Sequence, residues 1–505
     1  MAEVRVADIV VVVIYMLATV GIGARFFSQS STSKGFTLGS GAIPSWAIGL
    51  SILAVFTSSI SFVGNPGKAF TDNWAPITFA VTVPLVAILA GRVFVPLYRQ
   101  RGYVSAYALL EERLGYWARA YGSLSFLLIE VGRVSVILYL VSLVVAPTLG
   151  LSIPAIVLTA SVVVTFYTVL GGIEAVIWTD VVQIIVMLTG AIWCLVQISL
   201  LMPDGPAQIF SIALQPGSKF HPGDLSWRLD GQTFLGVFLF GVLSNLENFG
   251  IDQNYVQRYL TAGSDRQARR ALLVATWPYV PLTALFLLIG TGLYSFYQAF
   301  PDQLPAGITG DMVFPHFIRS QLPAGVSGLL VAAILAAAMS TLSSSLNCMA
   351  TVSVEDFYCH WRGNDVEEHT KVRALRGLTV FWGAVGAICS LTMVGYRSGL
   401  DLFWQICAAV GAGWLGVFLL AITRRRWHQR AVQWSLGVTI AFVAWANFSA
   451  RIEIAPPWLR SSLDPLFAGA MGTALMLLVA VALSWVFFKL GKPSPRVEDE
   501  RAVGR

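Results

Sequence analysis

Long apolar runs dominate the chain, and each is close to the length at which a helix crosses a bilayer. About 20 consecutive apolar residues suffice to span the hydrocarbon core. Thirteen such runs, numbered here as spans 0 to 12, cover residues 7–27, 46–63, 74–97, 123–149, 153–170, 176–201, 233–249, 272–300, 326–354, 378–394, 400–422, 431–449 and 466–490. Only 12% of the 505 residues are charged, against roughly 25% in soluble domains. We therefore expect an all-α polytopic membrane protein with no nucleic-acid partner, and we exclude a soluble enzyme and a disordered scaffold.

The loops between the spans predict the orientation of the chain in the membrane. If the N-terminus lies outside, 23 of the 33 Lys and Arg residues fall on the inner side and 8 on the outer side. Cytoplasmic loops are rich in these residues, so we predict an outside N-terminus and a cytoplasmic C-terminus. The 7–27 run lacks the basic flank and cleavage site of a signal peptide, so we read it as a retained helix.

Spans 1 and 6 run in opposite directions, and small or polar residues interrupt both. Span 1 contains Thr57, Ser58 and Ser61, and span 6 contains Asn245 and Asn248. Two weakly hydrophobic segments at corresponding positions in the two halves of a chain indicate a transporter with inverted five-helix repeats and discontinuous helices. The alternative is that small residues only let helices pack closely.

A stripe of hydroxyl side chains follows one face of span 8. Ala337, Ser340, Thr341 and Ser344 recur at i, i+3, i+4 and i+7, and Ser343 flanks them. A stripe of this kind gains nothing from facing lipid, so we expect it to face the bundle interior. Sodium, like calcium, is a hard cation that prefers oxygen ligands. Hydroxyls and the carbonyls of a broken helix can supply such ligands, although helix packing alone would also explain the small residues.

Asp180 lies early in span 5, at a depth comparable to Ser343 and Ser344. A charged side chain at mid-membrane costs roughly 3 kcal/mol, and less near the interface. Asp180 therefore requires a cation or a hydrogen-bonded cluster, unless it snorkels to the interface. A cation at Asp180 would place a second ion near the hydroxyl stripe.

The cysteines and histidines carry no sign of metal or redox chemistry. Five cysteines without paired spacing argue against a disulfide framework or a zinc site. The five histidines are divided between the two predicted sides of the membrane, and the motifs typical of hydrolases and metalloproteases are absent from suitable places. We therefore do not expect an enzyme.

Four segments together resemble the sodium:solute symporter family, which includes the sodium–glucose cotransporters and the bacterial sialic acid symporters. They are Gly-Gly-Ile-Glu-Ala-Val-Ile-Trp-Thr-Asp (171–180), Tyr-Val-Gln-Arg-Tyr (255–259), the stretch 340–347 and Thr-Leu-Gly-Ser-Gly-Ala-Ile-Pro-Ser-Trp (37–46). The similarity runs from about residue 7 to 425. It implies a leucine-transporter-like fold with a five-plus-five inverted repeat and extra helices at both ends.

The organisation implied by this resemblance divides the chain into six parts. They are a peripheral first helix (1–27), a first repeat of spans 1–5 (45–201), an outer loop (202–232), a second repeat of spans 6–10 (233–422), two peripheral helices (431–490) and a cytoplasmic tail (491–505).

The resemblance also implies two sodium sites. The first would lie between spans 1 and 8, with the carbonyls of Ala54, Thr57 and Ala337 and the hydroxyls of Ser340 and Thr341. The second, found in the sialic acid group, would use Asp180, Ser340, Ser343 and Ser344. Every side-chain ligand of both sites is present, so we predict two sodium ions.

The implied substrate site contains residues from spans 1, 2, 3 and 6. Its members would be Phe56, Ser58, Ser61, Pro76, Ala80, Arg133, Asn245 and Asn248. Arg133 matches the arginine that binds the sialic acid carboxylate in those relatives, and its planar fork suits a carboxylate. However, Glu130 lies at i−3 and could pair with Arg133, and Arg92 could compete for Glu130.

At three of these positions, the residue differs from the one expected in the sialic acid symporters. Phe56 replaces a threonine, and Pro76 and Ala80 replace an aromatic residue and a glutamine. Hydrogen-bonding groups are thereby lost, so a smaller or less polar acid could be the substrate. We predict a monomeric, sodium-driven importer of sialic acid or a related carboxylate. A neutral sugar is the alternative solute, and a sodium-responsive sensor or passive channel is the alternative class.

Overall fold

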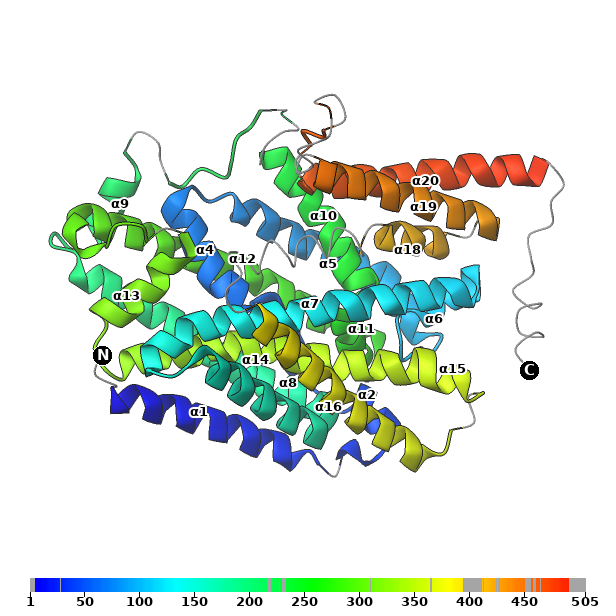
Figure 1. Ribbon diagram of the computed structural model, residues 1–505, viewed down its shortest axis with the longest axis horizontal. Helices are drawn as coiled ribbons and strands as arrows, with labels where there is room; N and C mark the ends of the chain where they lie inside the picture. The colour runs from blue at the N-terminus through cyan, green and yellow to red at the C-terminus, as the bar shows by residue number, and fades with distance from the viewer. Residues whose placement is uncertain are drawn as a thin grey trace.

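The computed structural model is a bundle of helices, most of which run roughly along the long axis of the molecule (Figure 1). The structure describes residues 5–489 except 28, 216–218, 227, 229–232, 309, 364–365, 394–410, 412, 424, 426, 450–455, 457–459 and 464. The longer helices are α1 (Val6–Arg25), α3 (Ser45–Phe56), α4 (Ser59–Thr71), α5 (Pro76–Arg99), α7 (Tyr116–Leu149), α8 (Ile153–Leu201), α10 (Phe234–Gly250), α11 (Gln253–Leu260), α12 (Asp265–Ala299), α13 (Val313–Gln321), α14 (Val326–Val352), α16 (Glu368–Thr392), α18 (Trp414–Ile422), α19 (Gln429–Phe448) and α20 (Pro465–Lys489). The shorter elements are η1 (Gln29–Ser31), α2 (Ser33–Leu38), α6 (Ala108–Leu114), α9 (Ala207–Ala213), η2 (Pro301–Gln303), η3 (Gly310–Met312), η4 (Ser353–Tyr358) and α15 (Cys359–Trp361).

Within the described residues, nine helices are long and apolar enough to cross a membrane, or up to eleven if each of two bent pairs forms one span. The bent pairs are α3 with α4 and α10 with α11, and they bend by 51° and 50°. They overlap predicted spans 1 and 6, and the break of span 1 falls at Thr57 and Ser58, as expected. The expectation for span 6 was wrong in position, because α10 runs unbroken through Asn245 and Asn248 and the break follows at residues 251–252. The first part of predicted span 10 and the tail at 491–505 lie outside the described residues.

Predicted spans 4 and 5 appear as one element, α8, because its two halves follow one another almost without a loop. Gly172 interrupts α8 with φ 57° and ψ −151°, a conformation that is not helical. A Cβ atom at this position would lie 2.8 Å from the carbonyl oxygen of Phe36. Only glycine combines a positive φ with so close an approach of another backbone.

Helix α14 forms the centre of the bundle. Every residue from 330 to 354 is buried, and α8, α7, α1, α16 and α3 pack around it. A helix that is apolar on all sides is expected at the centre of a bundle. The hydroxyl stripe of α14 therefore faces protein, and Ser340, Ser343 and Ser344 have no exposed surface.

The first and last helices lie at opposite edges of the molecule (Figure 1). Helix α1 packs against α8 and α14, whereas α20 packs against α19 and α10. The carboxylate of Asp8 accepts hydrogen bonds from the backbone N–H groups of Gly325 (2.7 Å) and Gly328 (2.8 Å) and from the Ser327 hydroxyl (2.7 Å). Because Gly325 at the N-cap of α14 has no side chain, Asp8 supplies the cap from another helix.

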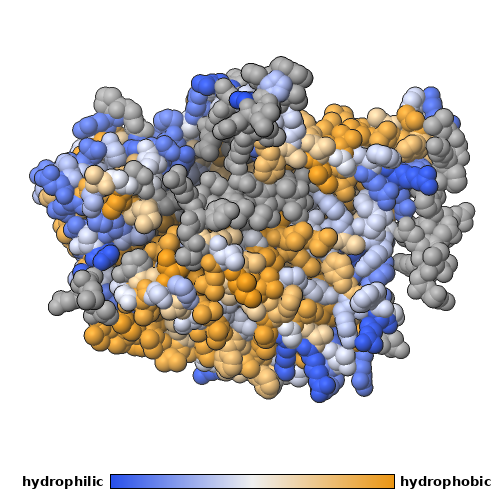
Figure 2. Space-filling view, in the orientation of Figure 1, coloured by the Kyte–Doolittle hydropathy of each residue, from blue (hydrophilic) through white to orange (hydrophobic). Residues whose placement is uncertain are grey.

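The surface has the polarity expected of a membrane protein. Figure 2 shows hydrophobic residues over the middle of the visible face and hydrophilic residues gathered at both ends of the long axis. Large apolar side chains are exposed on α1, α8 and α16, among them Leu17, Val162 and Ile388. These side chains would face lipid if the long axis crosses the bilayer.

Candidate functional site

The break between α3 and α4 leaves backbone carbonyls without helical partners. Helix α3 ends at Phe56, where the Leu53 carbonyl still accepts from the Thr57 N–H at 3.0 Å but the carbonyls after it have no continuing helix from which to accept. The Leu53 carbonyl accepts from the Thr57 hydroxyl at 2.9 Å, and the Ala54 carbonyl accepts from Ser340 of α14 at 3.2 Å. The negative end of the α3 dipole therefore faces the hydroxyl stripe, where a cation is favoured.

Hydrogen bonds at this break link four of the five predicted ligands of the first sodium site, namely Ala54, Ala337, Ser340 and Thr341. The Ser340 hydroxyl also donates to the Ala337 carbonyl at 3.0 Å, and the Thr341 hydroxyl donates to the same carbonyl at 3.4 Å. Thr57 is the residue that caps α3, with its N–H bonded to the Leu53 carbonyl. These oxygens are uncharged, which suits a weakly bound monovalent cation that must be released again.

Asp180 is fully buried in the bundle and does not snorkel to an interface. Its Oδ2 atom accepts a hydrogen bond from the Ser51 hydroxyl at 2.5 Å and pairs with Arg258 Nη2 at 2.9 Å. Its buried Oδ1 atom has no hydrogen-bond partner among the described residues. The Ser343 and Ser344 hydroxyls both donate to the Ser340 carbonyl, so three of the predicted ligands form one cluster on α14.

Sequence reasoning did not predict a role for Arg258 at this site. The structure buries it completely in α11, where its guanidinium contacts Ser51, Asp180 and Ser344. Arg258 belongs to the 255–259 motif, and α11 is strongly amphipathic with Gln253, Asn254 and Gln257 also buried. Since every residue from 253 to 259 is buried, the available signal was only that Arg258 lies within the 255–259 motif.

Arg133 forms an ion pair with Glu130, one turn earlier on α7, at 2.9 Å between Nη1 and Oε1. Its other terminal nitrogen lies 3.6 Å from Oδ2 of Asp252, which precedes α11 at the break of span 6. Glu130 also accepts a hydrogen bond from Ser345. The alternative pairing of Glu130 with Arg92 does not occur, because Arg92 is exposed on α5. Sequence reasoning missed Asp252, which as the N-cap of α11 could have been recognised from the break.

Phe56 lies at the break of span 1 and contacts aromatic residues beside the break of span 6. Its ring lies 4.7 Å from that of Tyr255, 5.2 Å from Tyr279 and 5.6 Å from Phe249, centroid to centroid. Phe249 and Tyr255 flank the break of span 6, so an aromatic cluster fills the space where the two broken helices meet. Beside it, the Ser61 hydroxyl donates to the Phe56 carbonyl at 3.4 Å, and the Ser58 hydroxyl caps α4.

The remaining predicted substrate residues lie at or near the contact between α5 and α10. Asn245 donates to the Thr82 hydroxyl at 3.1 Å, and Asn248 donates to the Asn245 side chain at 3.4 Å. Ala80 is buried in α5, whereas Pro76 begins that helix and is partly exposed. The side-chain amide of Asn245 thus donates its hydrogen bonds to α5 and α10.

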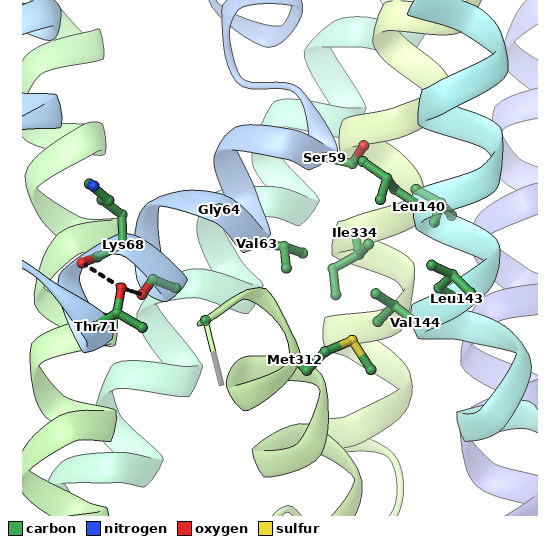
Figure 3. A pocket seen from close by; sticks show the side chains of 13 residues that line it. Ser59, Val63, Gly64, Lys68, Thr71, Leu140, Leu143, Val144, Met312 and Ile334 are labelled. Atoms are coloured by element: carbon green, nitrogen blue, oxygen red, sulfur yellow. Dashed lines mark hydrogen bonds between the residues drawn. The ribbon is translucent and has the colours of Figure 1, made fainter. Parts of the chain in front are cut away.

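A cavity of about 290 Å³ lies along α4, from Ser59 to Thr71 (Figure 3). Apolar side chains of α4, α7, α14 and η3 line it, including Val63, Leu143, Ile334 and Met312. The hydroxyl of Ser59 at one end is buried and has no hydrogen-bond partner in the described part of the chain. None of the predicted substrate or sodium residues lines this cavity, and Ser59 is its lining residue nearest in the chain to the break.

The far end of α4 is fixed by a lysine from the loop after α9. Lys219 donates to the carbonyls of Phe70 (2.8 Å), Thr71 and Asp72 (3.2 Å each). Partial burial lowers the pKa of the Lys219 amine, and the nearby Asp72 carboxylate opposes this shift. A cation at the C-terminal end of a helix is stabilising, so this contact anchors the second half of span 1.

An all-helical membrane bundle with two broken helices, and with hydroxyl and carbonyl oxygens gathered at one break, defines a secondary transporter. The chain belongs to the sodium:solute symporter family, whose model matches residues 36–437. It is therefore a sodium-coupled transporter and not an enzyme.

Two bacterial relatives cover nearly the whole chain. The sodium/sialic acid symporter NanT of Aliivibrio fischeri is 30% identical over 97% of this chain and 95% of its own length. The sodium/sialic acid symporter SiaT of Proteus mirabilis is 29% identical over 91% of this chain and 93% of its own length. A solved structure of a Na⁺-coupled sialic acid symporter in its substrate-bound, outward-open state has 28% identity and a TM-score of 0.88, and the match covers 95% of this chain and 98% of that one.

Proposed function

We propose that this transporter imports sialic acid or a related sugar acid together with two sodium ions, by alternating access. The observation that carries the proposal is the Ser340 hydroxyl, which joins the hydroxyl stripe of α14 to the Ala54 carbonyl at the break of span 1. A sodium ion at this point would hold the two halves of span 1 in place and favour binding of the solute. The names of the two bacterial relatives support sialic acid as the solute.

The architecture we propose has thirteen spans, with a five-plus-five inverted repeat between one peripheral helix and two more. If α8 is divided at Gly172 and span 10 is added to the spans found in the described residues, the number of spans reaches thirteen. The proposed boundaries of the six parts are those expected from the sequence. The distribution of Lys and Arg supports an outside N-terminus and a cytoplasmic C-terminus, and the bacterial relatives support a bacterial inner membrane as the location. We propose that a monomer is the functional unit.

The buried Asp180 supports a second ion. A tenfold sodium gradient is worth about 1.4 kcal/mol per ion, and ~100 mV is worth about 2.3 kcal/mol per net charge. Two ions with a monoanion therefore supply roughly 5 kcal/mol, enough to accumulate the solute several thousandfold. One ion with a monoanion supplies only about 1.4 kcal/mol, enough for about tenfold accumulation. The second site thus determines the concentrating power.

The test is uptake of labelled sialic acid into proteoliposomes, with external sodium against potassium, at an imposed inside-negative potential. We expect sodium-dependent uptake that the potential accelerates and one net positive charge moved per solute. In Asp180→Asn the charge moved per solute should fall to zero while sodium still stimulates uptake. Potential-independent uptake by the wild type would contradict a two-ion mechanism.

A neutral solute is the second candidate, and the ion pair between Glu130 and Arg133 favours it. With Glu130 at 2.9 Å and Asp252 at 3.6 Å, both terminal nitrogens of Arg133 face carboxylates of the protein itself. An acidic solute would have to displace one of them. Competition of labelled uptake by neutral sugars against sugar acids distinguishes the two candidates.

A further inference from the structure

The second proposed sodium site already contains a fixed cation. The guanidinium of Arg258 and the carboxylate of Asp180 are fully buried and lie 2.9 Å apart. The Ser51 hydroxyl accepts from Arg258 Nε at 2.7 Å and donates to Asp180 Oδ2 at 2.5 Å. All of these contacts fall on Oδ2, whereas the buried Oδ1 has no hydrogen-bond partner among the described residues.

The position of the guanidinium is determined from all sides. Its Nη1 atom donates to the Asn254 carbonyl at 2.7 Å, and its Nη2 atom also contacts the Ser344 hydroxyl. The group therefore connects α3, α8, α11 and α14, which include the first half of broken span 1 and the second half of broken span 6. A planar fork held by four partners cannot turn away from Asp180 without a movement of these helices.

A buried carboxylate oxygen without a partner is costly. Since Arg258 and Ser51 use only Oδ2, the second oxygen of Asp180 is available to another cation. Ser344 is one of the predicted sodium ligands and touches the same guanidinium. A sodium ion at this cluster would therefore lie within a few ångströms of a permanent positive charge, because arginine does not lose its proton in proteins.

We propose that Arg258 is a positioning residue that shares Asp180 with the second sodium ion and weakens the binding of that ion. This inference rests on the two-ion function proposed above. Two cations on one carboxylate repel each other, and the low dielectric of the interior strengthens the repulsion. The effect of Arg258 is to keep the second ion weakly bound, so that it leaves the protein within the transport cycle.

A purely structural role for the Arg258–Asp180 pair leads to a different expectation. Loss of one partner of a buried ion pair destabilises a protein in any salt, because the other charge is left unpaired. If Arg258 also competes with sodium, its loss should make the remaining carboxylate a stronger sodium ligand. The two roles therefore differ in the sodium concentration that stabilises the variant.

The test compares Arg258→Gln with the wild type by sodium-dependent thermal unfolding of the purified full chain, with potassium holding the ionic strength constant. We expect the half-saturating sodium concentration to fall about tenfold, because removal of a like charge a few ångströms away favours the ion. Arg258→Lys keeps the charge and should stay within about twofold of the wild type. An unchanged or higher half-saturating concentration in Arg258→Gln would overturn the proposal.

Arg119→Gln is the matched control. Arg119 pairs with the buried Asp356 at 2.6 Å, in a separate cluster that includes Ser105 and Ser123. Its loss should lower the unfolding temperature without a change in the half-saturating sodium concentration. We expect that folded Arg258→Gln protein can be purified in sodium but not in potassium, because sodium replaces the missing positive charge. If no folded Arg258→Gln protein can be purified in either salt, the proposal is overturned.

Asp180→Asn separates this inference from the function on which it rests. If this variant keeps the sodium dependence and cooperativity of the wild type, the second sodium site itself is wrong. If it loses the cooperativity while Arg258→Gln keeps the wild-type half-saturation, the two-ion function holds and only the role of Arg258 is wrong.

Discussion

The Ser340 hydroxyl donates a hydrogen bond to the Ala54 carbonyl at 3.2 Å and so joins the central helix α14 to the end of α3 at its break. We predict that Ser340→Ala abolishes the stimulation of uptake by sodium, because it removes a ligand that the two proposed sites share. Labelled uptake in sodium against potassium, in proteoliposomes of matched protein content, measures this effect.

Ser327→Ala is the control for this variant. Ser327 is a buried serine of the same helix, and its hydroxyl binds Asp8 instead of the cluster at the break. Its loss should cost about 1 kcal/mol of stability and leave the sodium dependence unchanged. Sodium stimulation of normal size in Ser340→Ala would rule out the site at the break of span 1.

The ion pair between Glu130 and Arg133 predicts opposite effects of two substitutions on an acidic solute. Arg133→Ala should abolish binding of an acid and spare a neutral sugar, because only the acid needs the guanidinium. Glu130→Gln frees Arg133 from its partner and should strengthen binding of an acid by roughly tenfold. Displacement of labelled solute by unlabelled acids and sugars gives both affinities.

Arg92→Ala serves as the control for these two variants, because Arg92 is an exposed arginine on a different helix, α5. It should bind both kinds of solute as the wild type does. If Glu130→Gln weakens the binding of acids, the ion pair orients Arg133 for the solute instead of competing with it.

Phe56→Thr restores the residue expected from the resemblance to the sialic acid symporters. It removes ring contacts to Phe249, Tyr255 and Tyr279, so the free energy of unfolding should fall by about 3 kcal/mol. The same change opens space and adds a hydroxyl where the breaks meet, so sialic acid should bind more tightly. Unfolding temperature and solute affinity, measured on one preparation, check the two parts.

Phe62→Thr loses comparable ring contacts, to Phe286 at 4.8 Å and Phe314 at 6.0 Å, and neither of these rings belongs to the aromatic cluster around Phe56. It should reduce stability and leave the affinity unchanged. Weaker binding of sialic acid by Phe56→Thr would show that the aromatic cluster itself contacts the solute.

Gly172→Ala should destabilise the turn within α8. Alanine at φ 57° is strained by roughly 1–3 kcal/mol, and its Cβ would lie 2.8 Å from the Phe36 carbonyl oxygen. Gly437→Ala, in an ordinary helical position with open space around it, should be neutral or slightly stabilising. Thermal unfolding of both variants measures the difference, and equal unfolding temperatures would contradict the strain at Gly172.

The sequence predicted the helices well because the bilayer imposes a length on each apolar run. The boundaries differ where a helix continues past its apolar part: α12 begins at Asp265 and α16 at Glu368, where the apolar runs begin at 272 and 378. Hydropathy identifies only the part in contact with hydrocarbon, whereas the charged first turns extend beyond it. The turn at Gly172 was too short to separate two helices in the structure.

The candidate site was less predictable, because its contacts join residues far apart in the chain. Periodicity placed Ser340 and Thr341 on one face, and the cost of a buried charge singled out Asp180. Neither argument could identify Arg258 as the partner, since that requires four helices to be placed in space. The separation of 78 residues between Arg258 and Asp180 leaves no local pattern to read.

Asp8 gives the first helix a role that its peripheral position hides. It caps α14 through Gly325, Ser327 and Gly328, and α14 holds the hydroxyls of both proposed sodium sites. Removal of α1, or a fusion that draws Asp8 away, would leave unpaired backbone donors at the start of the helix on which ion binding depends. A chain cut back to its two repeats would therefore lose sodium affinity along with stability, without any change to a ligand.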